Sequence, residues 1–294
     1  MQLPIGARYM LLASLAFSLM TLFVKLAGQR LPTQEIVAAR AGLTLAFSYV
    51  ALRHAGVPML GSRRPLLWLR GVFGFLALSS VYYAVTHLPL AEATVIQYLH
   101  PPLTALLAAL VLREALERAV LLSMGLGLIG LVLIAQPRAL FGAGSAALEP
   151  LAIAAAVAGA ILSACAYVTV RKLGATEHPL VIVLYFPLVA LPASIPTMVS
   201  STIWPVGMDW LWLLLVGVFT QIGQVSITRA LALDPAGQAT AYSYVQVPLA
   251  ALWGGLFFDA WPNRYSLLGA LLILVGAAVN VHASHRRAAL AARV

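Results

Sequence analysis

Long apolar stretches separated by short polar segments run along the whole chain. Ten of them, each of about 18–24 residues, are long enough to cross the hydrocarbon core of a bilayer as a helix. The apolar positions do not alternate as they do in a membrane barrel, and an open sheet edge cannot be satisfied in lipid. The pattern therefore predicts an all-α polytopic membrane protein with ten transmembrane helices. Their approximate ranges are 7–27, 35–53, 66–87, 91–112, 118–136, 150–172, 180–202, 210–231, 237–258 and 265–283.

The second half of the chain repeats the first. Near the start of each half, Lys25-Leu26 recurs as Lys172-Leu173 after a shift of 147 residues. A fixed internal period is the signature of a duplicated unit. Because five spans are an odd number, the second copy enters the membrane from the opposite side. We therefore expect two inverted five-helix repeats, residues 1–145 and 146–294, an architecture typical of secondary transporters. A shift of 146 residues also aligns a run of identical residues. The first-half members are Pro89, Ala93, Thr94, Tyr98, Pro102, Leu103, Ala105, Leu106 and Leu110, and their second-half counterparts, in the same order, are Pro235, Ala239, Thr240, Tyr244, Pro248, Leu249, Ala251, Leu252 and Leu256.

Composition agrees with a membrane protein. Apolar residues make up 62% of the chain and charged residues 9%, whereas a soluble domain has roughly a quarter charged residues. The net charge of +9 would suit nucleic acid, but the basic residues are spread over short loops with no hydrophilic domain to hold a duplex. The expected partners are the lipid bilayer and a small-molecule substrate, with no nucleic acid, and the protein is expected as a monomer or a homodimer. No cofactor is expected, since metal-ligand clusters, phosphate-binding glycine loops and nucleophile elbows are missing from the sequence.

The loop charges predict the orientation. If both termini lie on one side, the opposite side holds only Lys25, Arg30, Arg138 and Arg264. Such a bias places the richer side, and both termini, in the cytoplasm. Short loops and the absence of Asn-x-Ser/Thr sites favour a bacterial-type inner (plasma) membrane. The richer side holds Arg8, Arg53, Arg63, Arg64, Arg70, Arg113, Arg118, Arg171, Lys172, Arg229, Arg286, Arg287 and Arg293.

The first half contains the motifs Tyr82-Tyr83-Ala84, Leu88-Pro89-Leu90-Ala91, Pro102 and Leu112-Arg113-Glu114, with Arg40 in the second span. Together these motifs resemble those of a known transporter family, the EamA-type members of the drug/metabolite transporter superfamily. The second half departs from the pattern, because Asp259 stands one position out of register with Glu114 and Pro187 stands in place of Arg40. The resemblance covers almost the whole chain. It implies export or uptake of small organic metabolites such as amino acids, with export the commoner direction.

Prolines mark a candidate site near the middle of the membrane. Pro101 and Pro102 leave the carbonyl groups of Gln97 and Tyr98 without helical donors, and Pro248 has the same effect in the ninth span. Such carbonyls either line a water-filled cavity and accept hydrogen bonds from a substrate, or accompany kinks that shape the bundle. Their corresponding places in the two repeats favour the cavity.

Polar side chains fall on consistent faces of the predicted helices. Amide and hydroxyl groups are costly in lipid and should turn inward. For a single Ser or Thr, hydrogen bonding between helices is the favoured explanation. The glutamines and tyrosines together favour a cavity for a small amphipathic or zwitterionic molecule. His100 either titrates near neutral pH or, as we favour, is structural. The candidate substrate-binding residues are Tyr82, Thr94, Gln97, Tyr98, His100, Gln221, Gln224, Thr228, Tyr244 and Ser18.

Charged residues supply gating candidates beside the prolines. Arg40 either snorkels outward, pairs with Glu35, or stabilises an outer gate or a substrate carboxylate. Glu114 and Asp259 follow helix C-termini, where the helix dipole disfavours a carboxylate. Each should therefore have a cationic partner, and each serves either a gate or packing. The nearest cations are Arg113 and Arg118 for Glu114, and Arg264 for Asp259.

The sequence thus favours a secondary transporter that exports amino acids or related amphipathic or zwitterionic compounds by alternating access. The nine acidic residues all lie at span ends or in loops, which disfavours proton antiport around a buried carboxylate. The alternatives are another cargo class, such as drugs, amines or nucleotide-like molecules, and, with less support, a polytopic membrane enzyme, a channel or a receptor.

Overall fold

Helices build the part of the chain that the structure describes, and that part contains no strand. The structure is a computed structural model and describes residues 3–88, 90–137, 140, 149–198, 203–259 and 261–291. Pro89 and the end of the seventh predicted span lie outside these residues. The helices are α1 (Ile5–Ala27), α2 (Thr33–His54), α3 (Arg64–His87), α4 (Leu90–Gln97), α5 (His100–Leu112), α6 (Arg118–Ala135), α8 (Pro150–Leu173), α9 (Pro179–Met198), α10 (Met208–Leu233), α11 (Ala236–Ala241), α12 (Gln246–Phe258) and α13 (Arg264–Ala291).

Within the described residues, nine helical segments are long and apolar enough to cross a membrane. The prediction of an all-α, multi-pass membrane protein is confirmed. Two of the ten predicted spans are not continuous helices. Residues 91–112 divide into α4 and α5, and residues 237–258 into α11, a 3-10 turn (Tyr242–Val245) and α12. The nine include Ala93–Leu112 across the first break but do not include residues 237–258.

The first break follows from the prolines of α5. Pro101 and Pro102 stand in its first turn, where a missing amide costs little, but they cannot donate to carbonyl groups four residues earlier. The helix of α4 therefore ends at Gln97, and the chain restarts as α5 at His100.

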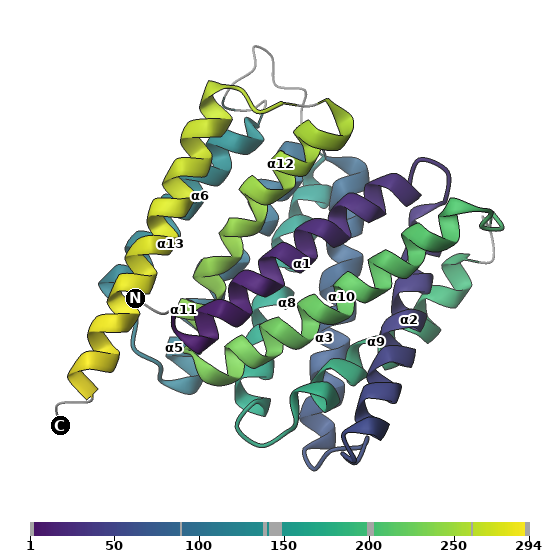
Figure 1. Ribbon diagram of the computed structural model, residues 1–294, viewed down its shortest axis with the longest axis horizontal. Coiled ribbons are helices and arrows are strands. Elements are labelled where there is room, and N and C mark those ends of the chain that lie inside the picture. Colours follow the sequence, from purple (N-terminus) through teal and green to yellow (C-terminus); the bar gives the residue numbers. More distant parts are fainter. Residues whose placement is uncertain are drawn as a thin grey trace.

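Helix pairs recur in the two halves. The closest pairs are α1 with α10, α3 with α8, α2 with α9 and α6 with α13. Figure 1 shows α6 and α13 side by side along one edge of the bundle, and α1 beside α10 through its middle. By the sequence repeat, α1 corresponds to α8 and α3 to α10, so the α1–α10 pair corresponds to the α8–α3 pair. The other two pairs each join a helix to its own counterpart, as two-fold-related copies would.

The contact between α6 and α13 has the same symmetry. A methyl group at Gly130 would lie 2.5 Å from the carbonyl oxygen of Gly269, and one at Gly276 would lie 2.9 Å from that of Ser123. In the repeat alignment at a shift of 146 residues, Gly130 corresponds to Gly276 and Ser123 corresponds to Gly269. Small residues allow such close backbone approach in membrane helices.

Two loop contacts at opposite ends of the bundle also correspond. In the first half, Arg30 after α1 forms an ion pair with Asp209 at the start of α10. In the second half, Glu177 after α8 accepts hydrogen bonds from the amides of Ser62 and Arg63, at 2.8 and 2.6 Å, just before α3. Arg30 corresponds to Glu177 at the 147-residue shift, and Arg63 to Asp209 at the 146-residue shift. Each repeat therefore uses its first loop to hold the third helix of the other.

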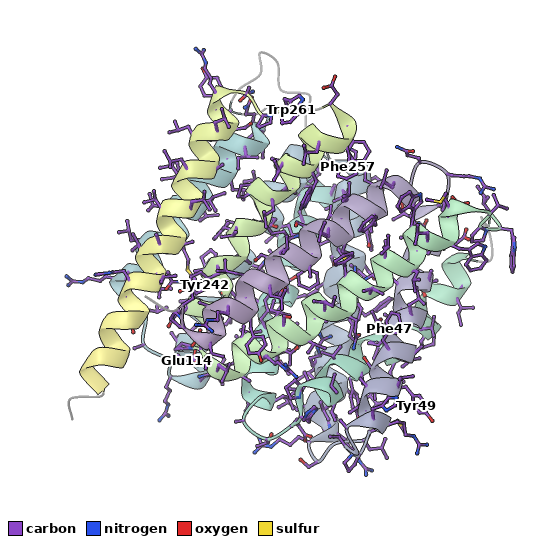
Figure 2. The ribbon with its side chains drawn as sticks, viewed as in Figure 1. Phe47, Tyr49, Glu114, Tyr242, Phe257 and Trp261 are labelled. Carbon is purple, nitrogen blue, oxygen red and sulfur yellow. The ribbon has the colours of Figure 1, made fainter. Side chains whose placement is uncertain are left out.

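The outer surface is apolar. Tyr49, Phe257 and Trp261 are among the large side chains that extend from it, with 43, 56 and 60% of their surfaces exposed (Figure 2). An apolar outer surface on a bundle of long helices is the surface that a bilayer requires.

Candidate functional site

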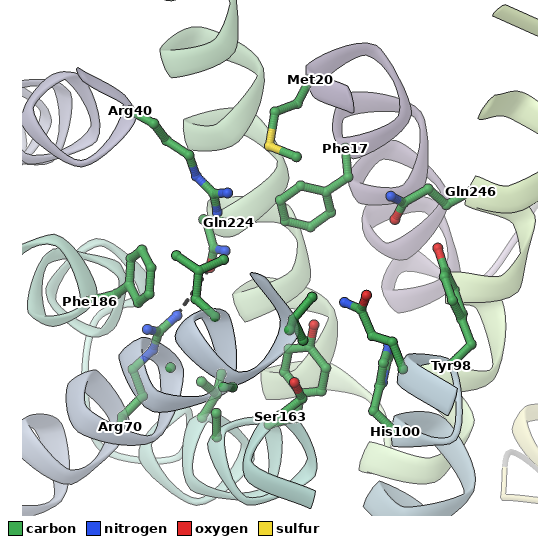
Figure 3. A pocket seen from close by; sticks show the side chains of 18 residues that line it. Phe17, Met20, Arg40, Arg70, Tyr98, His100, Ser163, Phe186, Gln224 and Gln246 are labelled. Carbon is green, nitrogen blue, oxygen red and sulfur yellow. Dashed lines mark hydrogen bonds between the residues drawn. The ribbon is translucent and has the colours of Figure 1, made fainter. Parts of the chain in front are cut away.

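A cavity of about 220 Å³ lies inside the bundle, lined from both halves of the chain (Figure 3). Its lining side chains come from α1, α2, α3, α4, α5, α8, α9, α10 and α12. Small residues create the space, since Gly74 and Ala77 of α3 and Ser163 and Ala166 of α8 project little into it. The cavity therefore lies where the repeats meet, which is where transporters of inverted-repeat architecture bind substrates.

Five of the residues predicted from the sequence line this cavity, namely Arg40, Gln97, Tyr98, His100 and Gln224. Figure 3 shows Arg40 and Gln224 on one side of it and Tyr98 and His100 on the other. The lining thus combines amide, aromatic and cationic groups.

Aromatic rings form one wall. The Tyr98 ring lies 5.7 Å from that of His100 and 5.8 Å from that of Tyr244, which it stacks against. His100 in turn meets Tyr167 edge-on, at 5.3 Å. His100 is buried, and its Nδ1 atom has no hydrogen-bond partner among the described residues.

One of the two carbonyl groups released by the prolines is satisfied by the protein. The hydroxyl of Tyr244 donates to the carbonyl oxygen of Tyr98 at 2.9 Å. Tyr244 is itself buried behind Tyr98 and is not a lining residue. At Tyr98 the break in the helix is therefore stabilised by the other repeat.

Other predicted residues lie away from the central cavity. Gln221 of α10 exchanges hydrogen bonds with Ser48 of α2, at 3.0 and 3.3 Å. Ser18 of α1 accepts a hydrogen bond from the indole of Trp253 at 3.1 Å. These contacts join neighbouring helices, which is the alternative expected for isolated polar side chains.

Three further candidates are also outside it. Thr94 is half-buried on α4, and Thr228 is fully buried in α10 with no hydroxyl partner among the described residues. Tyr82 lines a second pocket of about 450 Å³ between α2, α3 and α9. This pocket shares Leu78 with the central cavity, so the two spaces adjoin.

Arg40 neither extends outward to the membrane surface nor pairs with Glu35, which are two of the roles considered from the sequence. Its side chain points into the cavity, and its Nε atom has no partner among the described residues. Glu35 does not pair with it, because Glu35 accepts the amide of Ile203 at 3.1 Å instead.

Arg70 is a lining residue that the sequence analysis placed among the loop-side cations. It is only 5% exposed, and its Nη2 atom donates to the Gln224 side-chain oxygen at 3.1 Å. Its helical spacing gave a signal, since Arg70, Gly74, Ala77 and Val81 form one stripe of α3 with intervals of four, three and four residues. Tyr167, Phe186 and Gln246 were also missed.

Beyond one end of the cavity, a cluster of polar side chains holds neighbouring chain segments together. Arg171, next to the lining residue Val170, donates from Nε to Glu114 at 2.7 Å. The other oxygen of Glu114 accepts the amide of Ala236, also at 2.7 Å. Arg171 also donates to two carbonyl groups at the end of α10, at 3.0 and 2.9 Å. The partner of Glu114 is therefore a cation from the other half, rather than one of its sequence neighbours.

Asp259 occupies the place of Arg113 rather than that of Glu114. Asp259 and Arg113 end α12 and α5, with left-handed φ angles of 53° and 58°. No ion pair joins Asp259 to Arg264 in the described part of the chain. Asp259 is therefore one position out of register with Glu114 because it is the counterpart of Arg113 at the end of the corresponding helix.

Comparisons with known proteins agree with this architecture. The sequence profile of the EamA-like transporter family matches residues 4–136 and again residues 150–281. The pseudopaline exporter CntI of Pseudomonas aeruginosa (strain UCBPP-PA14) is 34% identical over 271 residues, which cover 92% of this chain and 93% of the exporter. Solute carrier family 35 member G1 of Homo sapiens is 30% identical over 290 residues, which cover 94% of this chain and 79% of the carrier. A solved crystal structure with 24% sequence identity has the same fold, with a TM-score of 0.80 over 94% of this chain and 98% of that one. The chain belongs to the EamA-like transporter family.

Proposed function

We propose that this transporter exports a small organic metabolite, an amino acid or a related amphipathic or zwitterionic compound, across the inner membrane by alternating access. The central cavity carries this proposal, because both halves of the chain contribute aromatic, amide and guanidinium groups to it. Its volume of about 220 Å³ falls below the roughly 300–1,000 Å³ of pockets that hold drug-sized ligands. A small cargo is therefore favoured.

One observation supports the direction of transport, and another supports the orientation of the chain in the membrane. A relative that shares 34% of its aligned residues is named as an exporter. The positive-inside bias of the loops supports a cytoplasmic location for both termini. The cluster around Glu114 and Arg171 then lies at the cytoplasmic end.

We infer an inverted pair of repeats, residues 1–145 and 146–294, as the moving parts. The twofold match of the family profile supports the duplication. The corresponding helix pairs α1–α10 and α8–α3 support a pseudo-two-fold relation between the copies. Alternating access in such proteins consists largely of one repeat rocking against the other.

The two ends of the bundle carry unequal contacts. Lys25 corresponds to Lys172 at the 147-residue shift and to its neighbour Arg171 at the 146-residue shift, and Glu114 corresponds to the residue next to Asp259. The Lys25 ammonium lies 3.9 Å from the ring of Phe258, and no ion pair joins it to Asp259 in the described residues. We infer that this structure is the outward-facing state, closed by Glu114 and Arg171, and that Lys25 and Asp259 pair when the opposite end closes.

The cavity argues against one alternative cargo. Arg40 and Arg70 place positive charge in a region of low dielectric constant. A cationic drug or amine would be repelled there.

Transport assays with purified protein in liposomes test the proposal. A carrier of amino-acid-like compounds should show saturable uptake and trans-stimulation, and Tyr98→Ala and Gln224→Ala should each reduce the rate at least tenfold without loss of folded protein. Tyr49→Ala, on the outer surface, is the control and should transport normally. Full transport by both cavity variants would place the substrate site elsewhere. Flux that neither saturates nor responds to trans substrate would indicate a channel.

A further inference from the structure

Two cations share the cavity without a carboxylate. Arg40 of α2 and Arg70 of α3 both line it, and no Asp or Glu does so among the described residues. Glu114 is paired with Arg171 and does not line the cavity. The charge of the two guanidinium groups is therefore not compensated by the protein.

The two groups face one space. Their Cζ atoms lie 5.9 and 5.4 Å from the centre of the same ring, that of Phe186. They can therefore be no more than about 11 Å apart. Figure 3 shows both side chains directed toward the region in front of Gln224.

Donor atoms remain free on both arginines. Nε of Arg40 and both Nε and Nη1 of Arg70 are buried and have no partner among the described residues. Within the part of the chain that the structure describes, Nη2 of Arg70 alone has a protein acceptor, the side-chain oxygen of Gln224 at 3.1 Å. Leaving a buried charge unpaired is strongly destabilising, and an ionisable group within a membrane commonly marks a substrate path.

We infer that the cargo is an organic anion with two or more carboxylate groups, one bound by Arg40 and another by Arg70. This inference rests on the proposed function and specifies its substrate class. A guanidinium group offers paired N–H donors that match the two oxygens of a carboxylate. The Phe186 ring between the cations contacts the carbon chain that joins the two acids. Tyr98, Gln97 and His100 on the opposite wall contact the rest of the molecule.

The distance limit and the volume restrict the molecule. Two carboxylates bound to cations no more than about 11 Å apart suit a backbone of a few carbon atoms. A monocarboxylate or a zwitterion with one carboxylate would leave one arginine unpaired, so the inference selects the amino-acid-like compounds that carry a second carboxylate. A nucleotide would have to extend from this cavity of about 220 Å³ into the adjoining pocket of about 450 Å³.

Thermal unfolding of the purified full-length protein at low salt tests this inference. The probes are succinate, glutarate and tricarballylate, each compared with its fully amidated analogue, with butyrate, and with adenosine monophosphate. A binding diacid or triacid should raise the melting temperature by roughly 5 °C at a hundredfold excess over its dissociation constant. The amides should have no effect, and butyrate should have a smaller one.

Arginine variants separate binding from structural support. Arg40→Gln and Arg70→Gln should each weaken binding of the best acid at least tenfold, whereas Arg53→Gln, an exposed cation of α2 next to Tyr49, should leave it unchanged. The ligand-free melting temperature of the two cavity variants should stay level or rise, because each removes an unpaired buried charge. If both cavity variants melted at a lower temperature than the wild type and still bound the acid, the arginines would be structural and the inference would be overturned.

The remaining outcomes are also decisive. Equal shifts with acids and amides, or a response to adenosine monophosphate alone, would overturn the inference. Saturable transport of an amino acid that is insensitive to Arg40→Gln and Arg70→Gln would do so too, while leaving the proposed transport function intact. Acids that bind through both arginines but are never moved in liposomes would support the binding site and contradict the transport proposal.

Discussion

The hydroxyl of Tyr244 donates a hydrogen bond to the backbone carbonyl of Tyr98 at 2.9 Å, and the two rings stack with centres 5.8 Å apart. The residues are 146 positions apart, one period of the internal repeat. Pro102 removes the amide that would otherwise bond to this carbonyl. Each half of the protein therefore depends on the other at the break that borders the cavity.

Removal of the Tyr244 hydroxyl should destabilise the protein. Tyr244→Phe keeps the stacked ring but leaves the Tyr98 carbonyl without its donor, and an unsatisfied buried acceptor costs about 1–3 kcal/mol. Thermal or denaturant unfolding in detergent measures the loss. Tyr49→Phe is the control, because the Tyr49 hydroxyl bonds only to the exposed side chain of Arg53 in the described structure. Equal stability of the two variants would contradict a supporting role for this hydrogen bond.

Disruption of the ion pair between Glu114 and Arg171 should open the end of the bundle that we propose to be cytoplasmic. The probe is Val170→Cys in a Cys165→Ser background, because Cys165 is the one native cysteine and Val170 lines the cavity beside Arg171. A membrane-impermeant maleimide added to inside-out vesicles should label this cysteine about tenfold faster when Glu114→Gln is added, as expected for the loss of about 1.4 kcal/mol from the closed state.

Two further variants complete that test. Arg118→Gln removes a neighbouring exposed cation and should leave labelling unchanged. Asp259→Asn should slow it, because the inward-facing state loses its proposed contact with Lys25. If Glu114→Gln left the labelling rate unchanged, the ion pair between Glu114 and Arg171 would not be a gate.

Much of the fold followed from the sequence, because lipid leaves few choices for the backbone. Membership of the EamA-type transporters, rather than of an enzyme class, is confirmed by the family match. Pro101 and Pro102 predicted the position where the fourth span divides. The 3-10 turn in the ninth span was not predicted, because Pro248 lies three residues beyond it, inside α12.

The candidate site was harder to predict. Arg70 lies six residues after the start of α3, where a long cationic side chain can reach the membrane surface. Only the packing of α3 against α8 and α9 shows that it is buried. Gln221 and Gln224 share a stripe of α10, yet one meets Ser48 and the other Arg70. Periodicity identifies an inward face, whereas the neighbouring helices determine which residue reaches the cavity.

Acid should weaken the loop contact of Glu177. Burial opposes ionisation of this carboxyl group, but hydrogen bonds from the Ser62 hydroxyl and from the amides of Arg63 and Ser62 outweigh burial and hold its pKa below the ordinary value of 4.5. A lowered pKa in the folded state adds stability above pH 4.5, and this stability is lost as the pH falls through the lowered value.

The melting temperature measured between pH 7 and pH 3 tests this linkage. Glu177→Gln should melt lower than the wild type at pH 7, and its melting temperature should fall less as acid is added. Glu149→Gln is the control, since Glu149 is exposed and accepts a 3.3 Å hydrogen bond from Tyr83. Parallel curves for Glu177→Gln and the wild type would assign the acid sensitivity to other groups.

The close approach of α6 and α13 should tolerate no side chain at Gly130. In Gly130→Ala the added methyl group would lie 2.5 Å from the backbone oxygen of Gly269, so the two helices must separate. Overpacking of this kind costs about 1–3 kcal/mol. Gly125→Ala in the same helix is the matched control, because a methyl group there meets nothing within 4 Å, and alanine is the better helix former. Gly130→Ala should therefore lower the melting temperature, whereas Gly125→Ala should hold or raise it. If both variants gave the same melting temperature, the two helices could move apart at no cost, and the α6–α13 contact would not be a rigid joint between the halves.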